Sequence, residues 1–262
     1  MAPYLEDTIT SVLANLGDGD EYFIVDGGST DGSVDIIRRY EDRITGWVSE
    51  RDRGYADAIA KGFDRATGDI LCWINAGDLY LSGAFDAARD RLTDDIDLIF
   101  GDDFYIGEDS RVLSHSRGWV PNLRMATLFG SWSPLQDACF WRRSLYERIE
   151  GIDRSLEYAA DYDLFLRMAL AGRSSYVPVT FSAFRRHTGQ KSISGMAAYK
   201  SERRAVRSRE MALYNATPSR KLLRRIIYRS GMSIRSRLAS LIWRGPDLAG
   251  QLVTDFSSGT YR

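Results

Sequence analysis

The residues Glu21-Tyr-Phe-Ile-Val-Asp26 and the loop after them, Gly27-Gly-Ser-Thr-Asp-Gly32, decide the fold of this 262-residue chain. The first six residues form a short apolar run that ends in a carboxylate, which predicts a buried strand. Two adjacent glycines predict a turn, and apolar residues from Val34 to Tyr40 then recur at helical spacing. The sequence therefore predicts a strand, a tight turn and a helix, with Asp26 where the strand ends.

The alternation of strands and helices continues on both sides of this unit. Pro3, followed by apolar residues at helical spacing up to Leu16, predicts an amphipathic helix at the start. Further strands are predicted at 46–49, 69–75 and 97–100, and helices at 55–66 and 82–92. This order predicts an α/β fold, a Rossmann-like and mainly parallel sheet with helices on both faces. Ligands of such sheets bind beyond the carboxyl ends of the strands, where Asp26, Asn75 and Asp78 fall.

Residues 101–195 follow a looser pattern. They predict a hairpin with its turn at 107–110, a loop with a short helix at 119–134, a strand at 138–141, a helix at 161–171 and extended segments at 176–179 and 181–186. We assign residues 1–195 to one catalytic domain and residues 196–262 to a basic helical C-terminal extension.

Charge is distributed unevenly along the chain. The whole chain has 35 basic and 36 acidic residues, a net charge of -1, which argues against a basic field that would bind nucleic acid. Residues 196–262 hold 14 basic and 4 acidic residues, hence +10, which leaves -11 for residues 1–195. Between Arg220 and Arg244, eight basic residues accompany apolar residues at helical spacing. This segment fits a helix on an anionic membrane surface, and equally a helix packed on the acidic catalytic domain.

The chain has no visible secretion signal or membrane span. Its start, Met1 to Asp7, lacks a basic and an apolar region, and the longest apolar run covers only Ile70 to Ile74. Cys72 and Cys139 are too few for a disulfide framework, which favours a reducing compartment. We expect a cytoplasmic protein, peripheral on the inner face of the membrane if the basic segment binds lipid.

Taken singly, the polar motifs leave alternatives open. The loop after Asp26 lacks the glycine spacing of a dinucleotide site, and the chain has no P-loop, so an oxidoreductase and a P-loop NTPase are disfavoured. Asp26 could contact a base or ribose, or only close a turn. Asn75 and Asp78 suit a hard divalent cation that carries phosphate oxygens, or a helix cap. Asp161 stands at a predicted helix N-terminus, and His187 lies in a cationic loop that suits a diphosphate.

Six segments, read in order, closely resemble the family 2 glycosyltransferases. They are Val25–Ser33, Ser49–Gly62, Ala66–Tyr80, Gln136–Arg143, Asp161–Arg167 and Phe184–Ser192. Each segment alone is weak, but six in the family's order are specific, and the resemblance runs from about Pro3 to Ser194. It implies the GT-A fold, a sugar-nucleotide donor, a divalent metal such as Mg²⁺ or Mn²⁺, and inversion at the anomeric carbon.

The resemblance also implies roles for single residues. Asp161 looks like the general base that takes the proton from the acceptor hydroxyl. Asp78 resembles the metal-coordinating carboxylate, and His187 the late histidine that closes over metal and diphosphate. The residues that the resemblance and their chemistry assign to substrate binding are Asp26 at the nucleoside, Arg53, Asn75 and Arg186 near donor and metal, and Gln136 and Trp141 on the acceptor side.

The chain departs from the family pattern in two places. Gly77-Asp78 stands where many members carry two adjacent carboxylates, so Asn75, His187 or water would have to complete the metal shell. The family also begins with a strand and a loop ahead of its first helix, whereas this sequence starts at the helix. Three explanations fit this difference: a start of the sequence that is placed too late, a fragment, or a protein degraded in function. We expect a truncated start.

These motifs predict an inverting glycosyltransferase that moves a sugar from a nucleoside diphosphate to a glycan or lipid-linked acceptor. The alternative is a non-catalytic sugar-nucleotide or glycan-binding relic, which the thinned metal turn favours. A nucleotidyltransferase shares the α/β plan but leaves Asp161 and His187 unexplained. The sugar, the nucleotide and the acceptor stay open.

Overall fold

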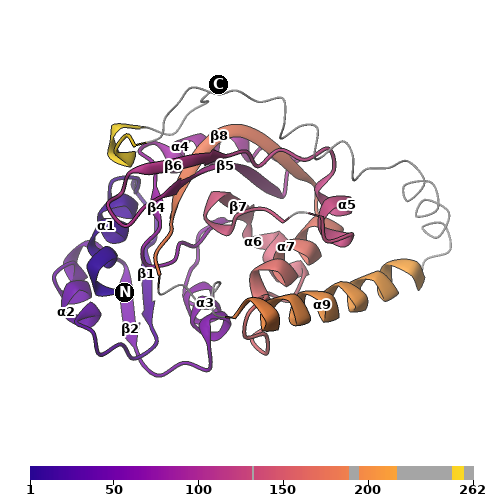
Figure 1. Cartoon of the computed structure of the whole chain (residues 1–262), viewed down its shortest axis with the longest axis horizontal. Helices are drawn as coiled ribbons and strands as arrows, with labels where there is room; N and C mark the ends of the chain where they lie inside the picture. The colour runs from indigo at the N-terminus through magenta and orange to yellow at the C-terminus, as the bar shows by residue number, and fades with distance from the viewer. Residues whose placement is uncertain (132, 189–194, 217–249, 257–262) are drawn as a thin grey trace.

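The computed structural model describes residues 1–131, 133–188, 195–216 and 250–256. Its first half alternates helices and strands as the sequence predicts (Figure 1). The elements are α1 (Ala2–Leu13), β1 (Phe23–Asp26), α2 (Ser33–Arg38), the 3-10 turn η1 (Glu41–Arg43), β2 (Gly46–Ser49), α3 (Tyr55–Phe63), β3 (Ile70–Leu71), β4 (Leu79–Tyr80), α4 (Ala84–Arg91) and β5 (Leu98–Ile106).

The second half is less regular, and it also follows the predicted order. Its elements are β6 (Val112–Ser116), α5 (Leu123–Leu128), η2 (Gln136–Ala138), β7 (Cys139–Arg142), α6 (Arg143–Arg148), α7 (Ala160–Ala171), β8 (Ser174–Arg185), α9 (Met196–Ala216) and η3 (Val253–Asp255). The predicted hairpin is confirmed, since β5 and β6 pair antiparallel around the turn at 107–110.

The strands form two sheets among the described residues. A larger sheet has the order β3-β7-β5-β8-β4, with β6 paired to β5, and β1 and β2 form a separate parallel pair. Only β1-β2 and β5-β8 are parallel there, so the sheet is mixed rather than mainly parallel. The reason is that β6 returns through a tight turn and β7 enters antiparallel between β3 and β5, whereas parallel pairing needs a crossover connection.

Helices cover both faces of the larger sheet, as predicted. Successive residues of β5 point to opposite faces, because side chains alternate along a strand. Leu98 and Phe100 pack in a core with residues of α3, α6 and α7. Ile99 packs in a second core with residues of α1 and α4. Both faces are therefore buried, and the polar carboxyl ends of the strands remain for a site.

The strand predicted over residues 69–75 is much shorter in the structure. Only Ile70 and Leu71 are paired, to β7 on one side. A strand that lacks a partner on its second edge has fewer hydrogen bonds to hold it extended. The shortening of β3 therefore marks an incomplete edge of the sheet.

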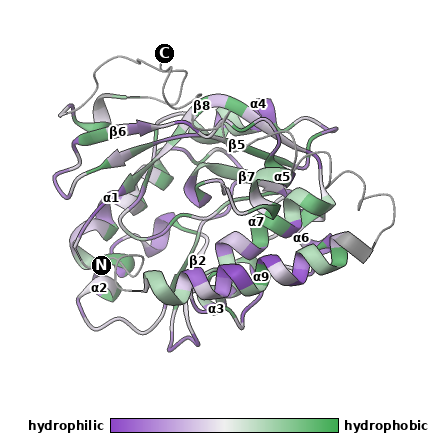
Figure 2. Cartoon of the chain, turned by 45° about the vertical axis from the view of Figure 1, so that its right-hand side comes forward, coloured by the Kyte–Doolittle hydropathy of each residue, from purple (hydrophilic) through white to green (hydrophobic). Residues whose placement is uncertain are grey.

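The described parts of the predicted extension pack on the rest of the chain. Val206 and Tyr214 of α9 share a core with Leu128 and with Tyr162 of α7, and Figure 2 shows that α9 carries both hydrophilic and hydrophobic residues. Val253 packs against the β5-β6 hairpin. The whole basic segment Arg220–Arg244 lies outside the described residues. Within the described chain, every helix is too short or too polar to cross a membrane.

Candidate active site

Asp26 ends β1 and organises the loop that follows it. One of its carboxylate oxygens accepts hydrogen bonds from the backbone N–H groups of Gly28 and Ser29, at 3.0 and 2.9 Å, and from the Ser49 hydroxyl at 2.6 Å. Burial alone would raise the pKa of Asp26, but the hydrogen bonds from Ser29 and Ser49 outweigh it and the pKa lies below its usual value. Asp26 is therefore a fixed anion that joins β1 to β2.

The loop after β2 lies directly against this turn. A Cβ atom added at Gly27 would stand 2.4 Å from a carboxylate oxygen of Asp52, so a larger residue there would displace the Asp52 side chain. Arg53, predicted near the donor, is 79% exposed and only loosely paired with Asp57, at 3.3 Å. Most of its guanidinium is therefore open to solvent.

Asp78 lies in the turn between β3 and β4 and is 5% exposed. One carboxylate oxygen accepts the backbone N–H of Arg185 at 2.9 Å, and the backbone carbonyl of Asp78 accepts the Thr8 hydroxyl. Burial, and then the nearby carboxyl of Asp137, raise the pKa of Asp78 well above its usual value. Asn75, three residues earlier, is exposed and forms a side-chain hydrogen bond to Asp78 that lowers this pKa.

Arg185 is the buried centre of this region, and the sequence motifs gave it no role. Its guanidinium donates to the Gly77 carbonyl at 2.8 Å, to the Ser110 hydroxyl at 2.9 Å and to the Asp7 carboxylate at 3.2 Å. It also lies 4.8 Å from the centre of the Tyr4 ring. Arg185 thus ties the Asp78 turn to the hairpin and to α1.

The two residues after Arg185 lie nearer the surface. Arg186 is exposed and its guanidinium stacks 4.1 Å above the ring of Tyr105. His187 is half-buried, with its ring centre 5.8 Å from that of Tyr4. Because Tyr4 also contacts Arg185, the structure brings His187 and the Asp78 turn to the start of the same helix, α1.

The oxygen and nitrogen donors near Asp78 fit a divalent cation by type. Asp78 supplies a carboxylate, Asn75 an amide oxygen and His187 an imidazole, and a cation such as Mg²⁺ keeps several water and phosphate ligands of its own. Among the described residues no three His, Cys, Asp or Glu side chains form a cluster that could hold a metal ion. A cation would therefore depend on the diphosphate for much of its shell.

Asp161 lies in the first turn of α7 and is partly exposed. Burial raises its pKa to about 6, and the opposing backbone hydrogen bonds and the positive charge of Arg203 do not cancel this effect. A carboxyl group with a pKa near the working pH is suited to accept a proton. Asp163, by contrast, is fully buried, and both of its carboxylate oxygens are paired with arginines, Arg167 and Arg209.

The N-terminus of α7 is capped by side chains from other elements. Its own N-cap residue, Ala159, has no capping side chain. The Tyr55 hydroxyl of α3 accepts the Ala160 N–H at 2.7 Å, and the Glu202 carboxylate of α9 accepts three backbone N–H groups of residues 157–159 at 2.8–3.0 Å. Sequence reasoning missed Tyr55 and Glu202, because nothing in their local sequence indicates a helix start 100 or 40 residues away.

The two residues predicted on the acceptor side differ in their surroundings. Gln136 is 9% exposed, and neither its amide oxygen nor its nitrogen has a partner among the described residues. Trp141 is fully buried, and its ring packs against Phe63, Trp73 and Phe165 in the core. The Gln136 amide is thus buried without a partner among the described residues, whereas the Trp141 ring is packed in the core.

Two more buried carboxylates lie beneath Gln136. Asp103 and Asp137 are both fully buried, and the Ser182 hydroxyl donates to Asp103 at 2.9 Å. Burial raises the pKa of Asp137 to about 6, and it raises that of Asp103 well above its usual value. The strand predicted over 97–100 extends to Ile106 in the structure, so Asp103 lies within β5, and nothing in the local sequence indicates that Asp137 would lie near it.

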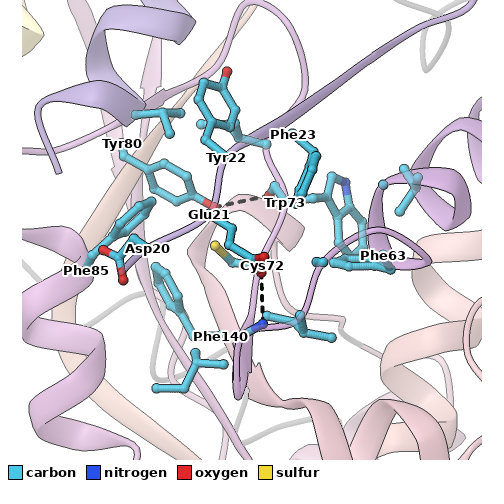
Figure 3. A pocket seen from close by; sticks show the side chains of 18 of the residues that line it. Asp20, Glu21, Tyr22, Phe23, Phe63, Cys72, Trp73, Tyr80, Phe85 and Phe140 are labelled. Atoms are coloured by element: carbon cyan, nitrogen blue, oxygen red, sulfur yellow. Dashed lines mark hydrogen bonds between the residues drawn. The ribbon is translucent and has the colours of Figure 1, made fainter. Parts of the chain in front are cut away.

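A cavity connects the separate parts of this edge of the sheet (Figure 3). Asp52, Tyr55 and Asn75 are among the residues that line it. Asp52 contacts the Gly27 turn, Tyr55 caps the helix of Asp161, and Asn75 bonds to Asp78. The predicted donor, metal and base residues therefore share one end of the molecule.

Known proteins similar to this chain are glycosyltransferases. An uncharacterised glycosyltransferase of Mycobacterium tuberculosis, Rv1514c, is 31% identical over 172 residues, which cover 63% of this chain and 64% of the relative. The chain thus matches less than two thirds of that protein's length.

Two solved structures share the fold. TarS of S. aureus, solved with UDP, has a TM-score of 0.55 and 17% identity, over 71% of this chain and 57% of TarS. The mannosyltransferase PcManGT of Pyrobaculum calidifontis, solved with GDP-Man and Mn²⁺, has a TM-score of 0.58 and 17% identity, over 84% of this chain and 63% of PcManGT. These likenesses show a GT-A fold.

The family assignment rests on the first half of the chain. The model of "Glycosyl transferase family 2" matches residues 2–149, more than half of the sequence and the part that carries Asp26, Asp78 and Gln136. With the order of motifs and the fold in agreement, the chain belongs to glycosyl transferase family 2.

Proposed function

We propose that this protein is an inverting glycosyltransferase that moves a sugar from a nucleoside diphosphate to a hydroxyl of a glycan or lipid-linked acceptor. The observation that carries the proposal is Asp161, a partly exposed carboxyl with a pKa of about 6 at the capped start of α7. The nucleotide-sugar and metal bound by PcManGT support the same donor chemistry here. A cytoplasmic location and membrane attachment through residues 220–244 belong to this proposal.

In the proposed reaction Asp161 takes the proton of the acceptor hydroxyl. The acceptor oxygen then attacks the anomeric carbon, while the bond from that carbon to the diphosphate oxygen breaks and the electron pair leaves with the nucleoside diphosphate. Asp26 would orient the nucleoside, and Arg53 and Arg186 would meet the phosphates. Gln136 would contact the acceptor side.

A divalent cation held by Asp78 with Asn75 and His187 would neutralise the charge that develops on the leaving diphosphate. Asp78 must be ionised to bind it, so binding of the cation has to offset the raised pKa of this carboxyl. Diphosphate binding and cation binding are therefore expected to depend on each other.

The test is a screen of nucleotide sugars for metal-dependent transfer or hydrolysis, repeated with Asp161→Asn and Asp78→Ala. Loss of the base should lower turnover by about 10²- to 10⁴-fold and leave donor affinity nearly unchanged. Asp78→Ala should lower turnover and, in calorimetry, remove the effect of Mn²⁺ on diphosphate affinity. Near-normal transfer by folded Asp161→Asn protein would refute the role of the base.

The second candidate is a sugar-nucleotide-binding protein without catalysis. The absence of a three-ligand cluster among the described residues favours it. Donor binding that is insensitive to Mn²⁺, with no turnover for any donor, would select this candidate.

A further inference from the structure

The helix α9 of the C-terminal extension lies against α7, the helix that begins with the proposed base (Figure 1 and Figure 2). The Glu202 carboxylate of α9 accepts three backbone N–H groups of residues 157–159 at 2.8–3.0 Å. The first N–H groups of a helix have no partner within the helix, and the helix dipole favours a carboxylate there. Glu202 therefore fixes the backbone that leads into Asp161.

Arg203, the next residue of α9, lies beside the same turn of α7. Its guanidinium donates to the Gly130 carbonyl at 3.1 Å and lies 4.5 Å from the centre of the Tyr162 ring. The Tyr162 hydroxyl in turn donates to the Thr127 carbonyl of α5 at 2.6 Å. These contacts hold a cation next to Asp161. Burial raises the pKa of Asp161, and the charge of Arg203 acts against this rise.

A second arginine of α9 has a different relation to α7. The Arg209 guanidinium pairs directly with one carboxylate oxygen of Asp163, and Arg167 pairs with the other. Asp161 has no such ion pair with a described residue, and one of its oxygens accepts the N–H of the residue that follows it. Asp161 is therefore influenced by the charge of Arg203 without being occupied by it, which suits a carboxylate that must accept a proton.

Other ionisable groups near Asp161 carry no charge at neutral pH. The Tyr55 hydroxyl of α3 accepts a backbone N–H of α7 at 2.7 Å, and burial raises the pKa of Tyr55 far above its usual value. Burial, and then the charge of Asp161, raise the pKa of Tyr199 on α9 to about 12. Arg203 is therefore the charged side chain that acts on Asp161 from α9.

We propose that α9 positions the base of the proposed transfer reaction, with Glu202 holding the backbone that carries Asp161 and Arg203 placing a cation beside its carboxylate. Neither side chain needs to touch a substrate, so both are positioning residues. Both lie beyond residue 149, where the match to the family model ends. The inference rests on the proposed role of Asp161, and it gives α9 a function in the site.

Carboxyl NMR tests the effect of Arg203 without any need for activity. The full chain is labelled with ¹³C at its Asp carboxyl carbons, and the Asp161 signal is assigned by its loss in Asp161→Asn. Arg203→Met, which keeps a long side chain over the Tyr162 ring, should raise the pKa of Asp161 by about 0.5–1, less than the change of about 1–3 that a direct ion pair produces. Arg203→Lys should restore most of the difference. The control Arg204→Met, an exposed neighbour on α9, should leave this pKa unchanged.

Turnover should follow the titration. If the pKa of Asp161 rises from about 6 to about 6.5–7, Arg203→Met should lower turnover about two- to fivefold at pH 6 and only slightly at pH 8, where the carboxyl is ionised again. A merely structural role of Arg203 would lower turnover by the same factor at every pH.

Glu202→Gln tests the backbone anchor. Glutamine keeps an acceptor oxygen but loses the charge, so amide exchange of residues 157–161 should speed up about tenfold or more. Turnover should fall at every pH, while KM for the donor stays near the wild-type value. Glu157→Gln is the matched control, because it makes the same charge change on an exposed side chain of the same segment, and it should have neither effect.

An unchanged pKa of Asp161 in Arg203→Met would overturn the inference, and so would unchanged amide exchange of residues 157–161 in folded Glu202→Gln. A shifted pKa with an unshifted turnover profile would overturn it as well. A wild-type protein that transfers no sugar from any nucleotide donor would instead refute the proposed function. The titration and the exchange need no turnover, so the two failures can be told apart.

Discussion

Asp161→Asn should make the protein more stable at neutral pH, although it removes the proposed base. Burial raises the pKa of Asp161 from 3.8 to about 6, so the folded state disfavours its ionised form. At about 1.36 kcal/mol per pKa unit, the full shift corresponds to about 3 kcal/mol. The side chain is partly exposed, and solvent screening reduces this to about 1–2 kcal/mol.

The sign of the pH dependence follows from proton linkage. Below about pH 4 the carboxyl is protonated in both folded and unfolded chains, so the substitution should change little. Between about pH 4 and 6 the unfolded chain ionises first, and the wild-type protein loses stability relative to Asp161→Asn. Above pH 6 the difference should be constant. Transfer, which needs the ionised base, should instead rise over the same interval.

Urea unfolding of both proteins at several values between pH 4 and 8 measures this difference. Asp163→Asn is the matched control, because Asp163 lies two residues away on α7 and is paired with two arginines. Removing one partner of a buried ion pair costs about 3 kcal/mol or more, so this variant should be less stable at neutral pH. An Asp161→Asn protein that is less stable than wild type at pH 7.5 would refute the argument.

Three further outcomes are expected. Tyr55→Phe should cost about 1–3 kcal/mol in urea unfolding, because the buried Ala160 N–H loses its acceptor, and it should lower turnover more than donor affinity. Glu202→Ala should lower the free energy of unfolding by about 1.5–3 kcal/mol, because charged hydrogen bonds are lost, and should speed amide exchange in α9. Unchanged exchange would show that other contacts hold this helix. The full chain should co-float with anionic vesicles in low salt, at about 1 kcal/mol per basic residue near the surface, whereas a chain ending at Ser219 should stay in solution.

The regular first half of the fold could be predicted because its strands and helices carry clear local patterns. The run ending at Asp26 and the helix of Asp161 are both found where the sequence predicts them. The strand directions after β5 could not be predicted, since an apolar segment such as Cys139–Arg142 reads the same whether it pairs parallel or antiparallel. Its direction depends on where the preceding loop returns the chain.

The predicted site residues differ in how well their sequence context describes their surroundings. Asp26 and Asp161 lie at element ends, and local pattern is sufficient to place them there. The short strand that holds Trp141 does not show whether its side chain is buried or exposed. In the structure its ring packs against three aromatic residues from distant segments. The roles of Arg185 and Tyr55 also depend on partners far along the chain. A single sequence therefore shows neither the contact of Arg185 with Asp7 nor the capping of α7 by the Tyr55 hydroxyl.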